Sequence, residues 1–283
     1  MSASDRTLLE ALLRNDLTAF TQRCFQTVVP GQRFLPNWHI QAITHQLERV
    51  RRGEIRRLMI TLPPRNLKSI CASVAFPAFV LGHDPAFRIV CASYSQDLTA
   101  KHARDCRAVI ESAWYRQIFP STRIDARKNT EGEFETTARG YRLGTSVGGT
   151  LTGRGGNLIL IDDPMKPAEA MSETKRAAVA DWYDTTLSSR LDHKTKDAIV
   201  LIMQRLHVDD LVGHVLEKDS SWAHLNLPAI ADVPHQIELG AGATYKRKLG
   251  EVLHPEREPM AVLDELKASM GSYAFSAQYQ QAP

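Results

Sequence analysis

Short apolar runs recur along the chain, and most are followed by a polar turn and then by a segment with helical spacing. They lie at residues 58–62, 88–94, 158–161, 198–203 and 222–227. Runs of this length are typical of strands buried on both faces of a parallel sheet. Apolar residues at helical spacing follow the first two runs, at 70–80 and 96–111. Because strand and helix alternate in this way, the sequence predicts an α/β fold with a mainly parallel central sheet flanked by helices.

The segments on either side of this alternating region have different patterns. Residues 5–29 carry apolar positions at helical spacing and predict one peripheral helix or a pair. Residues 130–147 predict a β-hairpin, whereas beyond Pro234 the pattern weakens into a polar, glycine-rich segment. Further helices are predicted at 38–52, 172–189 and 260–270. We therefore divide the chain into a helical N-terminal lead (1–37), a core domain (38–230) and a C-terminal extension (231–283).

The composition is that of an ordinary soluble globular protein. Of 283 residues, 43% are hydrophobic and 24% are charged, and the formal net charge is +3. This mild charge does not by itself imply a nucleic-acid partner, although basic residues cluster at 49–57 and 246–248. The four cysteines form no C-x-x-C pair, which argues against a zinc site. No apolar run approaches the roughly 18 residues that span a bilayer, so we expect no membrane partner.

The stretch from Leu58 to Ser69 has the order of a phosphate-binding loop. A buried strand leads into a short polar loop that ends in Lys68-Ser69, and a helix follows. At such a helix start, backbone N–H groups face the phosphates, the lysine reaches the outer ones, and the serine hydroxyl ligates Mg²⁺. Leu62 and Leu67 stand where the usual glycines would fall. Taken alone, this stretch supports a nucleotide site and an ordinary loop about equally.

Two carboxylates close the most hydrophobic strand, in the run Leu158-Ile159-Leu160-Ile161-Asp162-Asp163. In an open α/β sheet, ligands bind outside the carboxyl ends of the strands. There, one acid can orient the Mg²⁺ that bridges the outer phosphates, and the second can position the attacking water. The run also fits a plain strand-to-turn junction, but together with Lys68-Ser69 it favours a nucleoside triphosphatase. Gln204 ends the next buried strand and would join this site if strand order brings it alongside.

An ordered set of motifs, from about Trp38 to the last residue, resembles the large terminase subunit of tailed double-stranded DNA phages. The motifs are Trp38-His39-Ile40-Gln41, Leu62-Pro63-Pro64-Arg65-Asn66-Leu67-Lys68-Ser69, Gly148-Gly149-Thr150-Leu151-Thr152-Gly153-Arg154-Gly155, Leu160-Ile161-Asp162-Asp163-Pro164, Met203-Gln204-Arg205-Leu206-His207-Val208-Asp209-Asp210-Leu211 and Phe275-Ser276-Ala277-Gln278-Tyr279-Gln280-Gln281-Ala282-Pro283. That family is an ATP-driven motor that packages the phage genome. It has an N-terminal ATPase domain with the ASCE, RecA-like P-loop NTPase fold and a C-terminal nuclease domain. The resemblance implies that residues 38–230 are the P-loop ATPase core.

The resemblance also implies how the loop and the acids would act. Lys68 would contact the β- and γ-phosphates of ATP, while Ser69 and Asp162 would hold Mg²⁺. Asp163 falls where the family has its catalytic carboxylate, which is often a glutamate. The remaining loop positions implied to bind the nucleotide are Pro64, Arg65, Asn66 and Leu67.

Other implied roles lie outside the loop. Trp38 and Gln41 resemble the segment that contacts adenine, and Arg154 resembles the arginine that reaches into a neighbouring subunit's site. Gln204 would lie in the motif that couples hydrolysis to movement. The implied partners are double-stranded DNA, further copies of the chain in a ring, a portal protein and a small terminase subunit. The implied location is the cytoplasm of a bacterial host, and the chain is expected to stop before a nuclease domain.

Leu67 is the main departure from the family pattern. If that backbone position requires φ > 0, a leucine there costs roughly 1–2 kcal/mol and its side chain crowds the nucleotide. Two other functions therefore remain open. One is a helicase-like P-loop ATPase, which would need a second RecA-like half. The other is a degenerate P-loop protein that has lost hydrolysis and acts as a docking module.

Overall fold

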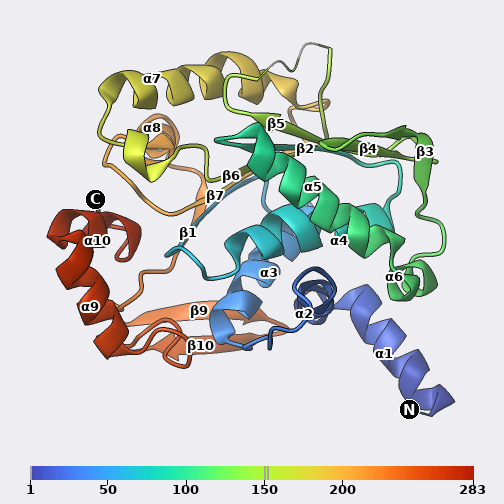
Figure 1. Cartoon of the computed structure of the whole chain (residues 1–283), viewed down its shortest axis with the longest axis horizontal. Helices are drawn as coiled ribbons and strands as arrows, with labels where there is room; N and C mark the ends of the chain where they lie inside the picture. Colours follow the sequence, from blue (N-terminus) through green and yellow to red (C-terminus); the bar gives the residue numbers. More distant parts are fainter. Residues whose placement is uncertain (1, 150, 152) are drawn as a thin grey trace.

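The computed structural model describes residues 2–149, 151 and 153–283, and its core is one eight-stranded sheet between two layers of helices (Figure 1). The strands are β1 (Arg57–Thr61), β2 (Arg88–Ser93), β3 (Ile124–Asn129), β4 (Glu133–Thr136), β5 (Tyr141–Ser146), β6 (Leu158–Asp162), β7 (Ala198–Met203), β8 (Ala223–Asn226), β9 (His235–Gly240) and β10 (Ala243–Arg247). The α-helices are α1 (Ala3–Asn15), α2 (Leu17–Val28), α3 (Trp38–Arg51), α4 (Phe76–His83), α5 (Gln96–Glu111), α6 (Ala113–Ile118), α7 (Glu173–Trp182), α8 (Leu211–Lys218), α9 (Met260–Met270) and α10 (Ser272–Gln278). Shorter helical turns are η1 (Ile70–Ala75), η2 (Pro167–Glu169), η3 (Tyr183–Leu187) and η4 (Ser188–Arg190).

The large sheet has the order β3-β4-β5-β2-β6-β7-β1-β8. Neighbouring strands from β5 to β8 in this order pair in parallel, while β3, β4 and β5 pair antiparallel. The prediction of a mainly parallel α/β sheet flanked by helices is therefore confirmed. In this order β7 lies between β6 and β1, so the ends of the three strands that carry Asp162, Gln204 and the Lys68 loop are neighbours.

Both faces of the sheet are buried because the central strands are apolar throughout. In β1, Leu58 and Ile60 face a hydrophobic cluster built with α2, α3, α4 and α5, whereas Met59 faces a second cluster built with α7 and α8. Figure 1 shows this arrangement, with α7 and α8 above the sheet and α3, α4 and α5 below it. Continuous apolar strands of this kind are expected where helices cover both faces.

Two predicted helices are less regular than their spacing indicated. The helix after the loop begins as a π-helical turn at Ile70–Ala75 and becomes α-helical only in α4. The helix predicted at 172–189 is α-helical only over Glu173–Trp182 and continues as π and 3₁₀ turns to Arg190. Residues 5–29 form a helix pair, because Asp16 ends α1 and its side chain caps the first turn of α2.

The two hairpins differ in how well the sequence predicted them. The hairpin predicted at 130–147 is β4–β5, and Arg139 in its turn has φ 72°. The segment after Pro234 is more regular than predicted, since β9 and β10 form an antiparallel hairpin around Gly240-Ala241-Gly242. Only Ile237 and Arg247 of this hairpin are buried. Too few apolar positions alternate there to give a strand pattern.

The C-terminal segment packs against the sheet edge and the start of α3. Hairpin β9–β10 contacts α3, and α9 and α10 form a small cluster of Ala229, Leu263, Phe275 and Tyr279. Backbone hydrogen bonds join Ala229 to Tyr279 and Leu253 to Ala229. The division into lead, core and extension remains a prediction. Among the described residues, no helix combines the length and apolarity needed to cross a bilayer.

Candidate functional site: a phosphate-type loop beside two carboxylates

The loop between β1 and η1 wraps around the start of a helix. Arg65 and Leu67 both have left-handed backbone conformations, with φ of 64° and 61°. The Leu67 carbonyl accepts a hydrogen bond from the Cys71 N–H at 3.0 Å, so the first helical turn begins inside the loop. The suspected positive φ of Leu67 is thus present, and its side chain packs against the main hydrophobic cluster. The amides at this helix start form the kind of site that favours an anion.

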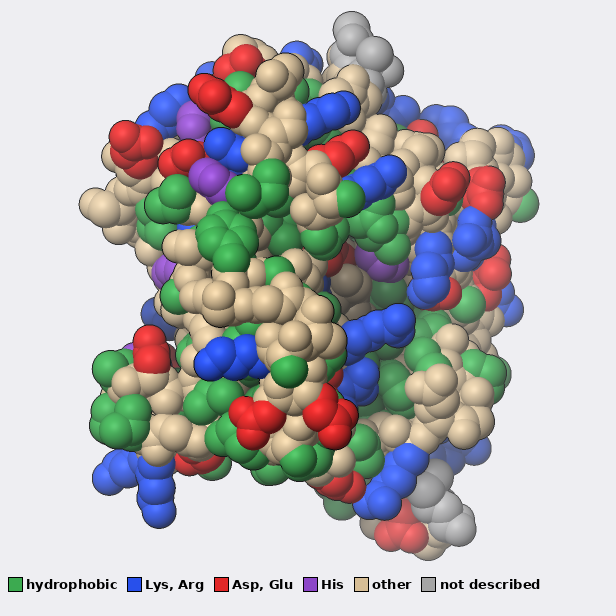
Figure 2. Space-filling model, turned by 60° about the vertical axis from the view of Figure 1, so that its left-hand side comes forward, with side chains coloured by type: hydrophobic (Ala, Val, Ile, Leu, Met, Phe, Trp, Pro, Cys, Tyr) green, Lys and Arg blue, Asp and Glu red, His purple; other side chains and the backbone are tan. Residues whose placement is uncertain are grey.

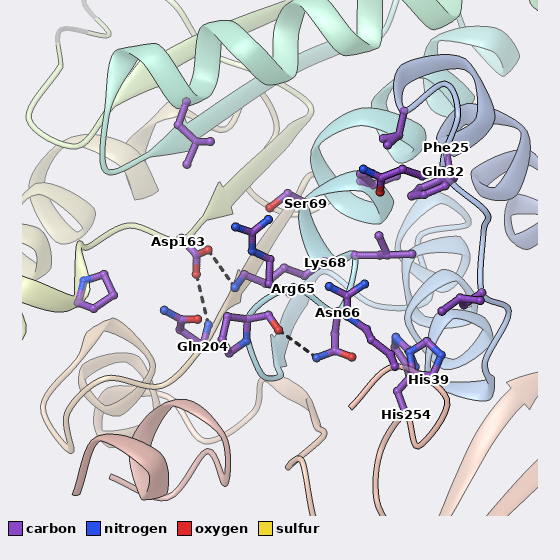
Figure 3. Close-up of a pocket in the computed structure, with 18 of the residues that line it drawn as sticks. Phe25, Gln32, His39, Arg65, Asn66, Lys68, Ser69, Asp163, Gln204 and His254 are labelled. Atoms are coloured by element: carbon purple, nitrogen blue, oxygen red, sulfur yellow. Dashed lines mark hydrogen bonds and ion pairs between the residues drawn. The ribbon is translucent and has the colours of Figure 1, made fainter. Parts of the chain in front are cut away.

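Lys68 points from this loop to the end of β6. Its ammonium lies 3.0 Å from the Asp163 carboxylate, and the residue is only 6% exposed. Asp163 has φ 46°, and its Oδ1 also accepts the Gln204 N–H at 3.3 Å. Strand order therefore brings Lys68, Asp163 and Gln204 together, as the sequence required for Gln204 to join the site. Figure 3 shows the three side by side.

Asp162 lies deeper and is held by two hydroxyls. Ser69 Oγ donates to one carboxylate oxygen at 3.2 Å, and Ser73 Oγ donates to the other at 2.7 Å. Burial raises the pKa of Asp162, and the bond from Ser73 and the charge of Lys68 oppose this rise. Burial also raises the pKa of Asp163, while the Lys68 ammonium opposes it. The ion pair and the hydroxyls favour the charged carboxylates in a site that otherwise disfavours them.

Three residues behind Asp162 were not found from the sequence. Ser73 lies within η1, His102 Nδ1 lies 3.7 Å from Asp162 Oδ2, and Arg142 of β5 is fully buried. Burial lowers the pKa of His102 to about 3, so the imidazole is neutral at pH 7. Arg142 Nη2 donates to the Ser73 carbonyl at 3.2 Å, but its Nε and Nη1 have no partner among the described residues. The charge of this buried guanidinium also opposes the rise in the pKa of Asp162.

The donor set fits Mg²⁺ bound with a nucleotide. This ion is usually held by one or two carboxylates together with phosphate oxygens and waters, rather than by an all-protein cage. Ser69 Oγ and Asp162 Oδ1 are 3.2 Å apart, so they can present two hard oxygen ligands to one ion. No group of three or more His, Cys, Asp or Glu side chains suited to a metal occurs in the described part of the chain.

A cavity of about 690 Å³ opens in front of the loop. Its wall includes the phosphate-type loop, Asp163 just after β6, the segment between α2 and α3, and His254 from the C-terminal segment (Figure 3). The sequence-predicted residues that line it are Pro64, Arg65, Asn66, Leu67, Lys68, Ser69, Asp163 and Gln204. Apolar wall is supplied by Phe25, Val29, Leu35 and Leu98. The volume and the mixed lining suit a nucleotide-sized ligand.

Two predicted adenine contacts are placed elsewhere. Neither Trp38 nor Gln41 is among the lining residues of this cavity. The Trp38 ring stacks on Tyr245 of β10 with 4.5 Å between centroids, and Arg247 lies 5.5 Å from the Trp38 ring centroid. Gln41 is exposed and lines a separate groove beside the β9–β10 hairpin. From the same helix it is the buried His39 that reaches the cavity, and burial lowers the pKa of His39 to about 3.

Arg154 lies outside the cavity, near the β4–β5 hairpin. It forms an ion pair with Glu133, and its guanidinium carbon lies 4.7 Å from the centroid of the Tyr141 ring. The side chain is 40% exposed, so another molecule can reach it. The glycine-rich motif that precedes Arg154 includes Thr150 and Thr152, which lie outside the described residues. The structure therefore does not bring Arg154 into contact with the Lys68 site of its own chain.

The two basic clusters are only partly neutralised or buried. Arg49 lies 3.3 Å from Glu54, and Arg51 lies 2.9 Å from Glu48. Arg247 is 2% exposed and donates to the carbonyls of Pro228 and Ala229. On the face drawn in Figure 2, basic and acidic side chains are interspersed. Arg52 and Arg56 of the first cluster and Lys246 and Lys248 of the second are exposed.

The fold and the site together define a class: a P-loop NTPase-type α/β domain. In solved structures this fold recurs in the ATPase domain of the large terminase of Thermus phage P74-26, with a TM-score of 0.53 and 14% identity over 87% of this chain and 98% of that chain. An R139A mutant of that domain aligns with a TM-score of 0.53 and 13% identity, over 90% of this chain and 96% of the other. The fold of the present chain is thus that of a phage large terminase ATPase domain, which confirms the sequence-based resemblance at the level of the fold.

The bacteriophage HK97 large terminase also aligns, with a TM-score of 0.47 and 15% identity over 78% of this chain. The chain spans less than half of that protein, since the alignment covers 45% of it. No protein-family model and no curated protein sequence matches the chain.

Proposed function

We propose that the chain is the ATPase motor domain of a viral DNA-packaging terminase, which hydrolyses ATP with Mg²⁺ to move double-stranded DNA into a procapsid. The observation that carries this proposal is the meeting of Lys68, Asp163 and Ser69–Asp162 at one helix start, beside a nucleotide-sized cavity. The fold shared with phage terminase ATPase domains supports the motor function over other P-loop functions.

In this proposal each polar group at the loop has one task. The helix-start amides and Lys68 hold the outer phosphates of ATP. Ser69 and Asp162 would hold Mg²⁺, which would neutralise charge on those phosphates. Asp163 orients the attacking water, and the Lys68 ammonium, 3.0 Å away, opposes the rise that burial causes in the pKa of this carboxyl. Gln204, next to Asp163, senses whether the outer phosphate is present.

The remaining parts of the proposal concern other molecules. Arg154 would leave Glu133 and reach into the site of a neighbouring copy in a ring, where an arginine finger adds roughly 10³–10⁵ in rate. DNA would be held through its phosphates, with a strong dependence of affinity on salt. A portal protein and a small terminase subunit would be the other partners, and the host cytoplasm the location.

One observation favours a second function, a docking module without hydrolysis. Leu67 adopts φ 61° where a glycine would adopt it freely, and its side chain lines the cavity that the nucleotide would enter. If this side chain blocks the nucleotide, the loop is only structural and ATP does not bind.

Calorimetric titration with Mg²⁺ and a non-hydrolysable ATP analogue separates the two functions. Lys68→Ala removes a charge-assisted contact, which corresponds to an affinity about 10- to 100-fold weaker. Lys175→Ala is the matched control, because Lys175 is 59% exposed on α7 and its ion pair with Glu169 is long, at 4.0 Å. Binding that is lost in Lys68→Ala and kept in Lys175→Ala supports the ATPase. No binding by the unaltered chain supports the docking module.

A further inference from the structure

Two neighbouring backbone amides at the exit of β7 have very different partners. The Gln204 N–H donates to Oδ1 of Asp163 at 3.3 Å, and the next amide, that of Arg205, donates to Oε1 of Gln281 at 2.9 Å. Gln281 lies 76 positions further along the sequence. One side chain near the C-terminal end of the chain therefore holds the peptide unit that follows the contact to the proposed catalytic acid.

Gln281 is itself tightly held. It is 4% exposed and has φ 56°, a left-handed conformation that is uncommon for a residue with a side chain. Its amide nitrogen donates to the Gln278 carbonyl at 2.5 Å, which identifies the other atom, the one facing Arg205, as the carbonyl oxygen. The Ala282 N–H donates to the Ser276 carbonyl at 3.0 Å and closes the turn. An uncommon backbone conformation persists only where the surroundings hold it, and it often marks a functional position.

The Gln281 contact is not duplicated by the other tie at this exit. Asp210 accepts from the Arg205 side chain at 2.9 Å and from the Leu206 amide at 2.9 Å. Among the described residues, Gln281 is the only hydrogen-bond acceptor for the main-chain amide of Arg205. Asp210 thus fixes the outer part of the loop, and Gln281 fixes the part that adjoins Gln204.

We propose that Gln281 is a positioning residue for ATP hydrolysis: by holding the Arg205 amide, it sets the position of the Gln204 peptide and so of the Asp163 carboxylate. This inference rests on the proposed ATPase function. Neither Gln281 nor Arg205 lines the cavity, so the effect passes through the backbone and not through contact with the nucleotide. The position of the Asp163 carboxylate then depends on α10 and on the turn that follows it.

A role in positioning predicts a change in kcat without a matching change in KM. Gln281→Met keeps the length of the side chain but removes the acceptor, and the loss of one hydrogen bond to a backbone amide corresponds to about a five- to tenfold lower kcat. Gln281→Glu keeps an acceptor oxygen for the Arg205 amide but loses the donor to the Gln278 carbonyl, so its kcat is expected to lie between that of Gln281→Met and that of the unaltered chain. KM for ATP is expected to stay within about twofold in both variants.

Gln280→Met is the matched control. Gln280 lies next to Gln281 and makes two hydrogen bonds of 3.0 Å to the backbone of Ile230, so its loss disturbs the same segment without touching Arg205. Its kcat is expected to match that of the unaltered chain. Equal losses of kcat in Gln280→Met and Gln281→Met, or no loss in either, would overturn the inference.

Hydrogen exchange at the Gln204 and Arg205 amides tests the same inference without any activity. Gln281→Met should speed exchange at both amides, Gln281→Glu should speed it less, and Gln280→Met should leave it near that of the unaltered chain. Unchanged exchange in Gln281→Met would contradict the positioning role. If the unaltered chain shows no ATP hydrolysis, the proposed function fails, and this exchange measurement still decides whether Gln281 holds the strand exit.

Discussion

Leu67 offers a direct test of the backbone conformation on which the loop depends. An L-residue in the left-handed helical region costs about 1–2 kcal/mol, and glycine avoids this cost. Alanine and glycine both remove the leucine side chain, so comparing Leu67→Ala with Leu67→Gly isolates the backbone at φ 61°. Glycine loses about 0.4–1 kcal/mol through the greater freedom of the unfolded chain. We therefore expect Leu67→Gly to be more stable than Leu67→Ala by about 0.5–1 kcal/mol.

The assay is urea unfolding of both variants, with the free energy of unfolding taken from the midpoint and a shared slope. Lys101 provides the control position, because it is 59% exposed within α5. There the order should reverse, with Lys101→Ala about 1 kcal/mol more stable than Lys101→Gly. If alanine is the more stable residue at both positions, Leu67 is not held in a left-handed conformation, and the account of the loop is wrong.

Three further predictions follow from other parts of the structure. Trp38→Ala should lower the free energy of unfolding by about 1 kcal/mol or more, because the stack on Tyr245 is lost. ATP affinity measured by calorimetry should not change, and a loss of affinity would show that Trp38 contacts the nucleotide. If Arg154 acts in a neighbouring copy, the specific ATPase activity of the unaltered chain should rise with protein concentration, and Arg154→Ala should abolish this rise. Equal turnover in dilute and concentrated samples of both the unaltered chain and Arg154→Ala would exclude a role of Arg154 in a neighbouring copy. The pKa of His39 falls from 6.5 to about 3 on folding, so its contribution to stability is present above pH 6.5 and is lost as pH falls toward 3. Between pH 6.5 and 3, the free energy of unfolding should fall less steeply with pH in His39→Gln than in the unaltered chain. Identical slopes in the two proteins would refute the lowered pKa of His39.

The core of the site was predictable because its parts are local in sequence. The strand, loop and helix around Lys68 are contiguous, and Asp162 and Asp163 close an unmistakable apolar strand. Whether Gln204 joins the site depends on the strand order, which the sequence alone did not give. In the structure β7 lies between β6 and β1, so Gln204 does lie beside Asp163. For a site at the carboxyl ends of adjacent parallel strands, the sequence therefore predicts the individual motifs, and the strand order is needed to show that they lie together.

The residues that the sequence missed act over long sequence separations. His102 of α5 lies 3.7 Å from Asp162, Arg142 of β5 donates to the Ser73 carbonyl, and Gln281 accepts from the Arg205 amide across 76 positions. Nothing in the local pattern of a strand or helix interior marks such a residue. Trp38 was assigned to adenine from the family resemblance, and its stack on Tyr245 was not predicted because the β9–β10 hairpin has too few buried residues to give a strand pattern.

Comparison of ATP turnover in the unaltered chain and in Asp163→Asn tests the central claim most directly. The substitution keeps the size of the side chain but removes the charge that orients the water, and loss of such a group typically lowers the rate by about 10²–10⁴. The account predicts Mg²⁺-dependent turnover in the unaltered chain and, in Asp163→Asn, turnover at least about a hundredfold lower with ATP still bound. Equal turnover in the two proteins would contradict it.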